Sequence, residues 1–426
     1  MVLSAEVTTR LLGAIETDLL VFLCGAGLSL PSPSDLLSAV KVAQICYDRW
    51  QSIEILDPAF RNDVDRLAAH FYARGDFNKV FIRRLVPWNE LVGRPNSGHA
   101  AIADLLISRG AYAALSTNFD SLIESWAEER KIALQGALTA QDALDIANAN
   151  PLIKLHGCIR AREGTLWTQA QLADPAIQAR MECFSDWMKL ALPGKDLVVV
   201  GFWSDWSYLN DALANAFSID NARSVTVIDP SPTVTLQTKA PAFWAKLNGM
   251  SDAFVHIQAS GDEALEELKT AYSKTWARRY YALGGALVQG AGGTVEVKAP
   301  FDALAMDDLY NLRRDAEGVP YTRAARLKEP AATAAQAAAV HVMLLNNGAT
   351  QQGAWLQLGG RSIRVVNGAG QGLADVQAQY KEPATILQSE IVVCAGAFDF
   401  GVPARVIDPG RGASTIRPTP VEALCG

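Results

Sequence analysis

The sequence predicts a doubly wound α/β fold built on a parallel sheet, and two patterns support this class. Short apolar runs recur along the chain, most of them bounded by glycine, proline or a polar residue: 19–25, 111–117, 151–157, 196–202, 224–230 and 253–259. Segments of helical spacing lie between them, at 63–74, 99–108, 121–130 and 211–217. Strands that alternate with helices form βαβ units with parallel strands. Ligands bind such sheets beyond the carboxyl ends of the strands, so the residues that follow each run are the candidates for chemistry.

Composition excludes several classes of protein. Of the 426 residues, 50% are hydrophobic and 19% are charged, which predicts a folded chain of two or three domains rather than a disordered one. No run approaches the roughly 20 apolar residues of a spanning helix, so we expect a cytoplasmic protein with no signal peptide or membrane anchor. A net charge of -7 argues against a protein that wraps nucleic acid by itself. Any contact with nucleic acid is therefore expected through a partner.

The cysteines do not form a metal-binding or redox pattern. No two of them have the C-x-x-C spacing that a structural zinc site or a redox pair uses. We expect reduced thiols and no metal. The cysteines are Cys24, Cys46, Cys158, Cys183, Cys394 and Cys425.

The chain is expected to divide into two domains. The stretch from about 35 to 95 has helical patterns and no convincing strand, which predicts a helical insertion that closes over the pocket. Composition changes at Gly284-Gly285 and again at 290–293, as in a linker, so we place a nucleotide-binding domain at 1–285 and a small α+β domain at 286–426. The second domain is expected to open with a helix around 307–315 and to continue through the Ala-rich segment 331–339 into 341–345. Strands are expected at 355–358, 362–366, 386–393 and 403–407.

A glycine loop follows the first strand. Two glycines in the segment from Cys24 to Ser29 let the backbone approach a ligand, so that N–H groups can face a pyrophosphate. The full G-x-G-x-x-G fingerprint is absent because Leu30 stands at the third glycine position. A plain tight turn is therefore an equal alternative for this loop alone.

Four further strand ends carry polar residues. They are 116–120 (Ser-Thr-Asn-Phe-Asp), 156–157 (His-Gly), 201–205 (Gly-Phe-Trp-Ser-Asp) and 229–230 (Asp-Pro). Any one of them is explained by the capping of a following helix. Five strand ends in succession, with an asparagine and a histidine among them, favour a ligand site.

These motifs resemble the sirtuin superfamily in type and in order. The glycine loop 25–29 looks like its phosphate loop, 95–99 like the start of the next helix, 116–120 like its T-Q-N-I-D element, and 154–157 like the strand that bears the sirtuin histidine. The resemblance covers about residues 15–260. It implies a Rossmann-like, sirtuin-type domain that binds NAD as its substrate.

The resemblance also implies a role for each matching residue. Asn118 would orient the nicotinamide ribose and a water, His156 would be the general base, and Asp120 would steady the carboxamide side of the pocket. The alternatives are a core histidine at His156 and a turn residue at Asp229. NAD contacts are further implied for Gly25, Ala26, Gly27, Ser29, Thr117, Gly201, Ser204, Asp205 and Asp229.

Departures from the family pattern favour hydrolysis over deacylation. Only Cys158 and Cys183 lie between His156 and the next long strand, so a four-cysteine zinc module is ruled out. The segment that pairs an acyl-lysine peptide is not recognisable in 203–207. Without that peptide, a water captures the cation-like sugar when nicotinamide leaves. The expected function is a zinc-free NAD glycohydrolase; the alternatives are a non-catalytic module that senses NAD or ADP-ribose and, less favoured, a protein deacylase.

Zinc-free sirtuin-like domains with an added C-terminal domain resemble the NAD-depleting effectors of bacterial anti-phage defence, which act by abortive infection. The resemblance implies a homo-oligomer and a partner, either a HerA-like ATPase or a short prokaryotic Argonaute. The chain has no Walker A loop, so it supplies no ATPase of its own. Its modest C-terminal region favours the ATPase partner.

Two groups of residues are left with open roles. Trp203 and Trp206 either gate the pocket or pack under the helical insertion. Four arginines of the C-terminal region form either an interaction face or a solvated helix surface. These are Arg313, Arg314, Arg323 and Arg326.

Overall fold

The computed structural model describes most of the chain, and what it describes divides into two compact units. The units are Met1–Leu268 and Lys269–Gly426. The boundary lies inside a long helix, whereas the sequence placed it at 285/286. The described residues are 1–130, 132–145, 150–217, 221–295, 306–317, 328–352, 355–367, 391–395, 405–407 and 416–418.

The first unit is built on a parallel sheet, which confirms the predicted fold class. Its order within the described residues is β3-β4-β2-β1-β5-β6-β7, and every neighbouring pair is parallel. Most of its strands are buried on both faces, which explains why they read as continuous apolar runs rather than alternating ones. The strands are β1 Leu20–Cys24, β2 Ala113–Ser116, β3 Gly136–Ala137, β4 Leu152–Lys154, β5 Asp196–Val200, β6 Ser224–Ile228 and β7 Phe254–Ile257.

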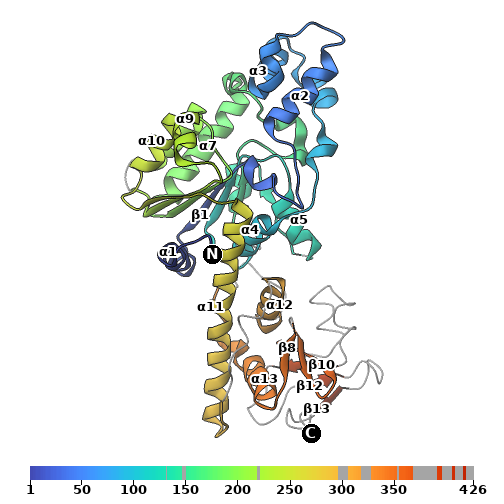
Figure 1. The fold of residues 1–426 in the computed structure, drawn as a ribbon, viewed down its shortest axis with the longest axis vertical. Helices are drawn as coiled ribbons and strands as arrows, with labels where there is room; N and C mark the ends of the chain where they lie inside the picture. The colour runs from blue at the N-terminus through green and yellow to red at the C-terminus, as the bar shows by residue number, and fades with distance from the viewer. Residues whose placement is uncertain are drawn as a thin grey trace. The chain divides into compact units, whose positions relative to one another are not determined.

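Helices cover both faces of this sheet (Figure 1). On one side are α1 Ala5–Glu16, α4 Ser97–Ile107 and α5 Leu122–Glu129. Apolar side chains of the helices on the other side pack in one cluster with inward residues of the strands. Those helices are α6 Ala140–Asp145, α7 Pro175–Ala191, α8 Ser207–Ala216, α9 Thr233–Lys239 and α10 Pro241–Gly249. The sequence did not predict α1 or the two-residue strand β3.

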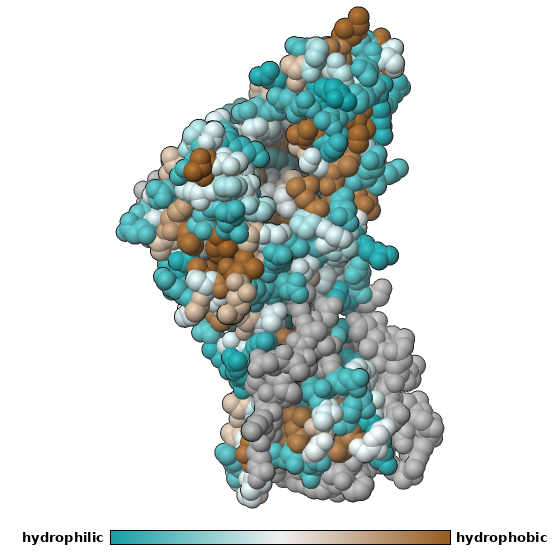
Figure 2. All heavy atoms as spheres, in the orientation of Figure 1, coloured by the Kyte–Doolittle hydropathy of each residue, from teal (hydrophilic) through white to brown (hydrophobic). Residues whose placement is uncertain are grey.

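The stretch between β1 and α4 forms a helical lobe with its own aromatic core, at the top of Figure 1. Phe119 and Trp167, from the segments that follow β2 and β4, pack into that core. The lobe therefore packs on the ends of the strands. Apolar side chains also reach its surface, as Figure 2 shows, and Ile55 is 97% exposed. The lobe contains η1 Ala26–Ser29, α2 Ala39–Trp50, η2 Pro58–Asn62, α3 Val64–Ala73, η3 Phe77–Leu85 and η4 Trp88–Leu91.

The second unit is small and combines helices with a mixed sheet of order β13-β12-β11-β10-β9-β8 within the described residues. Only β10 and β11 pair in parallel; the other described pairs are antiparallel. Its elements are α11 Gly261–Gly290, which begins in the first unit, then α12 Met306–Glu317, η8 Ala332–Ala334, α13 Ala335–Asn346, β8 Thr350–Gln352, β9 Trp355–Leu358, β10 Arg361–Asn367, β11 Ile391–Ala395, β12 Arg405–Ile407 and β13 Ile416–Pro418.

The linker predicted at Gly284-Gly285 is wrong, because α11 continues to Gly290. Gly284 serves close packing of two helices instead. A Cβ at this position would lie 2.3 Å from the carbonyl carbon of Ala338 in α13, so only glycine lets the two helices approach. Composition alone does not distinguish a flexible glycine from one that is buried at a helix contact.

Two of the four arginines with open roles are buried in the second unit. Arg313 and Arg314 are each only 2% exposed, which contradicts both an interaction face and a solvated helix surface for this pair. The guanidinium of Arg313 lies 5.0 Å from the ring centroid of Tyr272 and 5.7 Å from that of Tyr310. Arg323 and Arg326 lie outside the described residues, as do 386–390 and 403–404 of the predicted strands.

Candidate active site

The ends of four neighbouring strands meet at one edge of the sheet. Val200, Cys24, Ser116 and Lys154 lie in one row across β5, β1, β2 and β4. Asn118 and His156 each follow this row by two residues on adjacent strands. The segments stay together beyond the sheet, because the rings of Phe119 and His156 are 6.4 Å apart. The sheet therefore brings the two predicted catalytic residues to neighbouring positions.

The side-chain amide of Asn118 is held in one orientation. Its Nδ2 donates to the carbonyl oxygen of Gly25 at 3.0 Å and to Oγ of Ser29 at 3.2 Å. Because the carbonyl oxygen of Gly25 can only accept a hydrogen bond, the side-chain atom of Asn118 that faces it must be the amide nitrogen. Asn118 is 8% exposed, and its Oδ1 is buried without a hydrogen-bond partner in the described chain. An unpartnered buried acceptor costs about 1–3 kcal/mol, so this oxygen is placed to receive a water or a ligand hydroxyl.

Ser29 connects Asn118 to a buried histidine and a carboxylate. Its Oγ lies 2.9 Å from Oδ2 of Asp120 and 3.1 Å from Nε2 of His99. A carboxylate only accepts, so the single hydroxyl proton goes to Asp120 and His99 must donate from Nε2. The same tautomer lets His99 Nδ1 accept from the N–H of Asn96, at 3.3 Å. Burial lowers the pKa of His99 to about 4, in keeping with this neutral form.

The glycine loop after β1 packs closely against the backbone that follows β5, where Gly201 lies. Gly201 has φ +62°, and a Cβ there would lie 2.3 Å from the backbone nitrogen of Leu28. The N–H of Gly25 donates to Val200 at 3.0 Å and that of Gly27 to Gly201 at 2.8 Å. These two amides bond to the β5 segment and are not the ones that could face a pyrophosphate. The prediction that N–H groups of this loop face a pyrophosphate stays a prediction.

His156 lies in an aromatic enclosure at the end of β4. Its ring centroid is 5.3 Å from Trp206 and 5.9 Å from Tyr208, and its Nε2 shares a hydrogen bond with the Tyr208 hydroxyl. Burial, and then the positive charge of Arg180, lower the pKa of His156 to about 3. The imidazole is therefore neutral near pH 7 and has the protonation state of a general base.

Three further residues that were predicted to contact NAD form hydrogen bonds with the protein backbone. Oγ1 of Thr117 donates to the carbonyl oxygen of Cys24 at 3.1 Å. Oγ of Ser204 accepts from the N–H of Trp206, at 3.3 Å. Oδ1 of the exposed Asp205 accepts from Phe243 N–H at the start of α10, at 3.0 Å.

Asp229 and Ala26, both predicted to contact NAD, lie in different surroundings: one in a turn and one at an exposed position. Asp229 makes a local turn, because its Oδ1 accepts from the N–H of Ser231 at 2.8 Å. This geometry is the turn alternative that its position before Pro230 suggested. Ala26, in contrast, is exposed at the start of η1.

The two tryptophans after β5 have separate roles. Trp203 donates from Nε1 to the carbonyl oxygen of Leu236 at 2.8 Å and its ring lies 5.1 Å from that of Phe243. It therefore packs against α9 and α10, away from the helical lobe. Trp206 lies beside His156 instead.

Sequence reasoning missed three side chains of the site: His99, Tyr208 and Arg180. His99 lies in the segment 95–99 that resembles the family, and the sequence predicts no role for its side chain. The other two come from helices α8 and α7, far along the chain from β2. Neither stands at a strand end, and no local pattern marks them.

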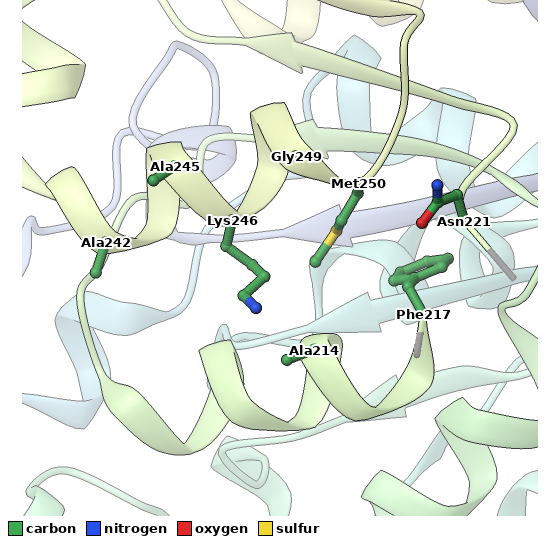
Figure 3. Close-up of a pocket in the computed structure, with 8 residues that line it drawn as sticks. All are labelled: Ala214, Phe217, Asn221, Ala242, Ala245, Lys246, Gly249 and Met250. Carbon is green, nitrogen blue, oxygen red and sulfur yellow. The ribbon is translucent and has the colours of Figure 1, made fainter. Parts of the chain in front are cut away.

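A separate pocket of about 350 Å³ lies between α8 and α10 (Figure 3). Phe217 and Met250 form its apolar part, while Lys246 and Asn221 contribute polar groups. None of the residues that line it belongs to the strand-end site. We assign it no part in the chemistry.

Neither a metal cluster nor a spanning helix occurs in the part of the chain that the structure describes. No three side chains of histidine, cysteine, aspartate or glutamate are grouped there in a way that would hold a metal ion. No helix there combines the length and the apolar character needed to cross a bilayer.

Comparison with known proteins relates this region to a family. Residues 113–249 match the model described as SIR2-like domain. No curated protein matches the chain. The matched stretch runs from β2 to α10 and holds Asn118, His156 and Gly201.

Solved structures with detectable similarity include Sir2 proteins bound to nucleotides. A Sir2 homologue mutant in complex with ADP-ribose is 17% identical, with 61% of this chain and 94% of that chain covered and a TM-score of 0.34. A Sir2 homologue–NAD complex is also 17% identical, with 61% and 91% covered and a TM-score of 0.34. A Sir2 complex with p53 peptide and NAD+ is 14% identical, with 61% and 96% covered and a TM-score of 0.34.

Proposed function

We propose that this chain hydrolyses NAD+ to ADP-ribose and nicotinamide at the strand-end site. The observation that carries the proposal is the fixed amide of Asn118, whose buried Oδ1 lacks a partner in the described chain while His156 lies at the neighbouring strand end. An acceptor and a neutral imidazole together suit the placement and deprotonation of a water.

The proposed reaction balances without a further reactant. The water oxygen, held by Asn118, forms a bond with the ribose carbon that carries nicotinamide. The bond from that carbon to the ring nitrogen breaks, and nicotinamide leaves as a neutral molecule. His156 takes the proton of the water. In this reaction the carboxylate of Asp120, which accepts from Ser29, would stabilise the positive charge that develops on the sugar.

Two observations favour water over an acyl-lysine as the nucleophile. The segment after β5 forms no strand that would pair a peptide; it leads into α8 at Ser207. Trp206 and Tyr208 from this segment lie against His156. A protein deacylase is the less favoured reading for this reason.

Release of nicotinamide from NAD+ by the purified full chain tests the proposal. We expect release that Asn118→Ala and His156→Ala abolish. A folded protein that binds NAD+ and releases no nicotinamide, alone or with the product of its neighbouring gene, would contradict it. That outcome would support a module that senses NAD or ADP-ribose, which the engaged Nε2 of His156 in this structure favours as the second candidate.

The pH dependence gives an independent prediction. Because burial lowers the pKa of His156, the base stays deprotonated as the pH falls through the ordinary histidine range. We expect kcat/KM for nicotinamide release to stay within about twofold between pH 8 and pH 5, because a base whose pKa is about 3 remains almost fully deprotonated over this range. Circular dichroism at each pH controls for unfolding. An acid limb centred near pH 6.5 would contradict a lowered pKa for the base.

We further propose that the chain acts as an effector that depletes NAD in bacterial anti-phage defence. It would do so in the cytoplasm, as a homo-oligomer controlled by a HerA-like ATPase or by a short prokaryotic Argonaute. Co-purification with the product of the neighbouring gene, followed by mass measurement of the complex, tests the partner. If the purified chain is a monomer and does not bind the product of the neighbouring gene, the proposed homo-oligomer and its partner are contradicted.

A further inference from the structure

Arg180 lies directly behind the loop that carries His156. Its Nη1 donates to the carbonyl oxygen of Gly164 at 2.9 Å. Gly164 in turn packs on Gly157, the residue after His156, because a Cβ on Gly157 would lie 2.9 Å from that same oxygen. The guanidinium therefore contacts the backbone segment that packs directly against the His156 loop.

The guanidinium is not fully paired. Its Nε and Nη2 are buried and have no hydrogen-bond partner, and no carboxylate of the described residues lies within ion-pair distance of Arg180. Arginine keeps its charge in proteins, and a buried cation without a counter-ion is costly. Burial lowers the pKa of Arg180, which reflects this cost. We therefore expect the guanidinium of Arg180 to pair with an anion when the protein binds its ligand.

The neighbouring groups suit an oxyanion. The Tyr208 hydroxyl, from α8, shares a hydrogen bond with Nε2 of His156 and interacts electrostatically with Arg180. A guanidinium beside a hydroxyl presents several N–H and O–H donors in one region, which matches the acceptor oxygens of a phosphate or a carboxylate. Helices α7 and α8 and the end of β4 thus converge on one small volume.

We propose that Arg180 and Tyr208 form an oxyanion subsite beside His156, which takes a phosphate or carboxylate group. The inference deepens the proposed function and rests on it, because the subsite adjoins the proposed base. The anion pairs with Nε and Nη2 of Arg180 and accepts from the Tyr208 hydroxyl. That hydroxyl then leaves Nε2 of His156 free to take a proton. The oxyanion comes either from the diphosphate of the dinucleotide or from a separate anion.

Binding of inorganic phosphate to the full chain tests the subsite. Tryptophan fluorescence reports on it through Trp206, and sodium chloride at equal ionic strength controls for screening. We expect Arg180→Gln to weaken phosphate binding by roughly 10- to 100-fold, the value of a charge-assisted hydrogen bond of about 1.5–3 kcal/mol. Arg162→Gln is the matched control, since it removes the same charge from an exposed site over Trp88. Equal phosphate affinity in Arg180→Gln and the wild type, or no binding by either, would overturn the inference.

A second measurement keeps the test independent of the folding of the variant. Burial and, to a smaller extent, the charge of Arg180 lower the pKa of His156. Phosphate bound to Arg180 neutralises that charge, so phosphate should raise this pKa in the wild-type protein. The imidazole signals in an NMR titration measure this, and an unchanged His156 signal at saturating phosphate would count against the subsite.

Two further arms separate the sources of the anion and separate this inference from the proposed function. If ADP-ribose displaces phosphate, and if Arg180→Gln also binds ADP-ribose more weakly, the diphosphate of the dinucleotide is the anion at the subsite. If ADP-ribose and phosphate bind at the same time, a separate anion occupies the subsite. Nicotinamide release is measured on the same samples. Release without any phosphate effect would overturn the subsite alone, and phosphate binding without release would overturn the hydrolase alone.

Discussion

Replacing Asn118 by alanine is expected to lower the rate constant of nicotinamide release by roughly 10²- to 10⁴-fold, the range for a group that positions or activates a reactant. The substitution removes the buried Oδ1 acceptor and both Nδ2 bonds of the site. Chromatographic measurement of nicotinamide at saturating NAD+ gives the rate. Affinity for ADP-ribose, measured by calorimetry, is expected to change by less than about tenfold, because the proposed role of the amide is to hold the attacking water rather than to bind the nucleotide.

Asn221→Ala is a suitable control for this variant. Asn221 lines the pocket between α8 and α10, so its loss removes an amide without touching the strand-end site. Thermal unfolding of both variants checks that the fold is kept. Full turnover by folded Asn118→Ala protein would refute the assigned role of the amide.

Replacing Gly201 by alanine is expected to lower the free energy of unfolding by roughly 2–5 kcal/mol. The left-handed backbone at φ +62° costs an alanine about 1–2 kcal/mol. The added Cβ would also meet the backbone of Leu28 and Gly27 at 2.3 Å and 2.7 Å, and overpacking of this kind adds about 1–3 kcal/mol. Urea unfolding followed by circular dichroism measures the sum.

Gly13→Ala provides the opposite expectation in the same assay. Gly13 is inside α1, and a Cβ there meets nothing within 4 Å. Alanine favours a helix over glycine by about 0.5–1 kcal/mol, so this variant should be slightly more stable than the wild type. An unchanged urea midpoint for Gly201→Ala would show that the β1 and β5 ends are not packed as tightly as the structure has them.

The predicted strands and helices agree with the structure where a local pattern is strong. The buried runs at β1, β5 and β6 match because a strand covered on both faces must be apolar throughout. The two-residue β3 is too short to form a pattern. At Gly284 the same residue type serves a helix contact rather than a linker, and its composition does not distinguish the two.

By itself, the sequence determined the parallel sheet and the arrival of Asn118, His156 and the glycine loop at one edge, because periodicity sets the strands and parallel strands end on the same side. Only the tertiary structure decided which polar atoms are paired. Asp205 and Asp229 look identical to ligand residues in the sequence, yet each accepts from a nearby backbone N–H. Tyr208 reaches His156, and Arg180 reaches the backbone that packs on the His156 loop, only because α7 and α8 pack on the same face of the sheet. Contacts between segments so far apart depend on packing, which no local pattern records.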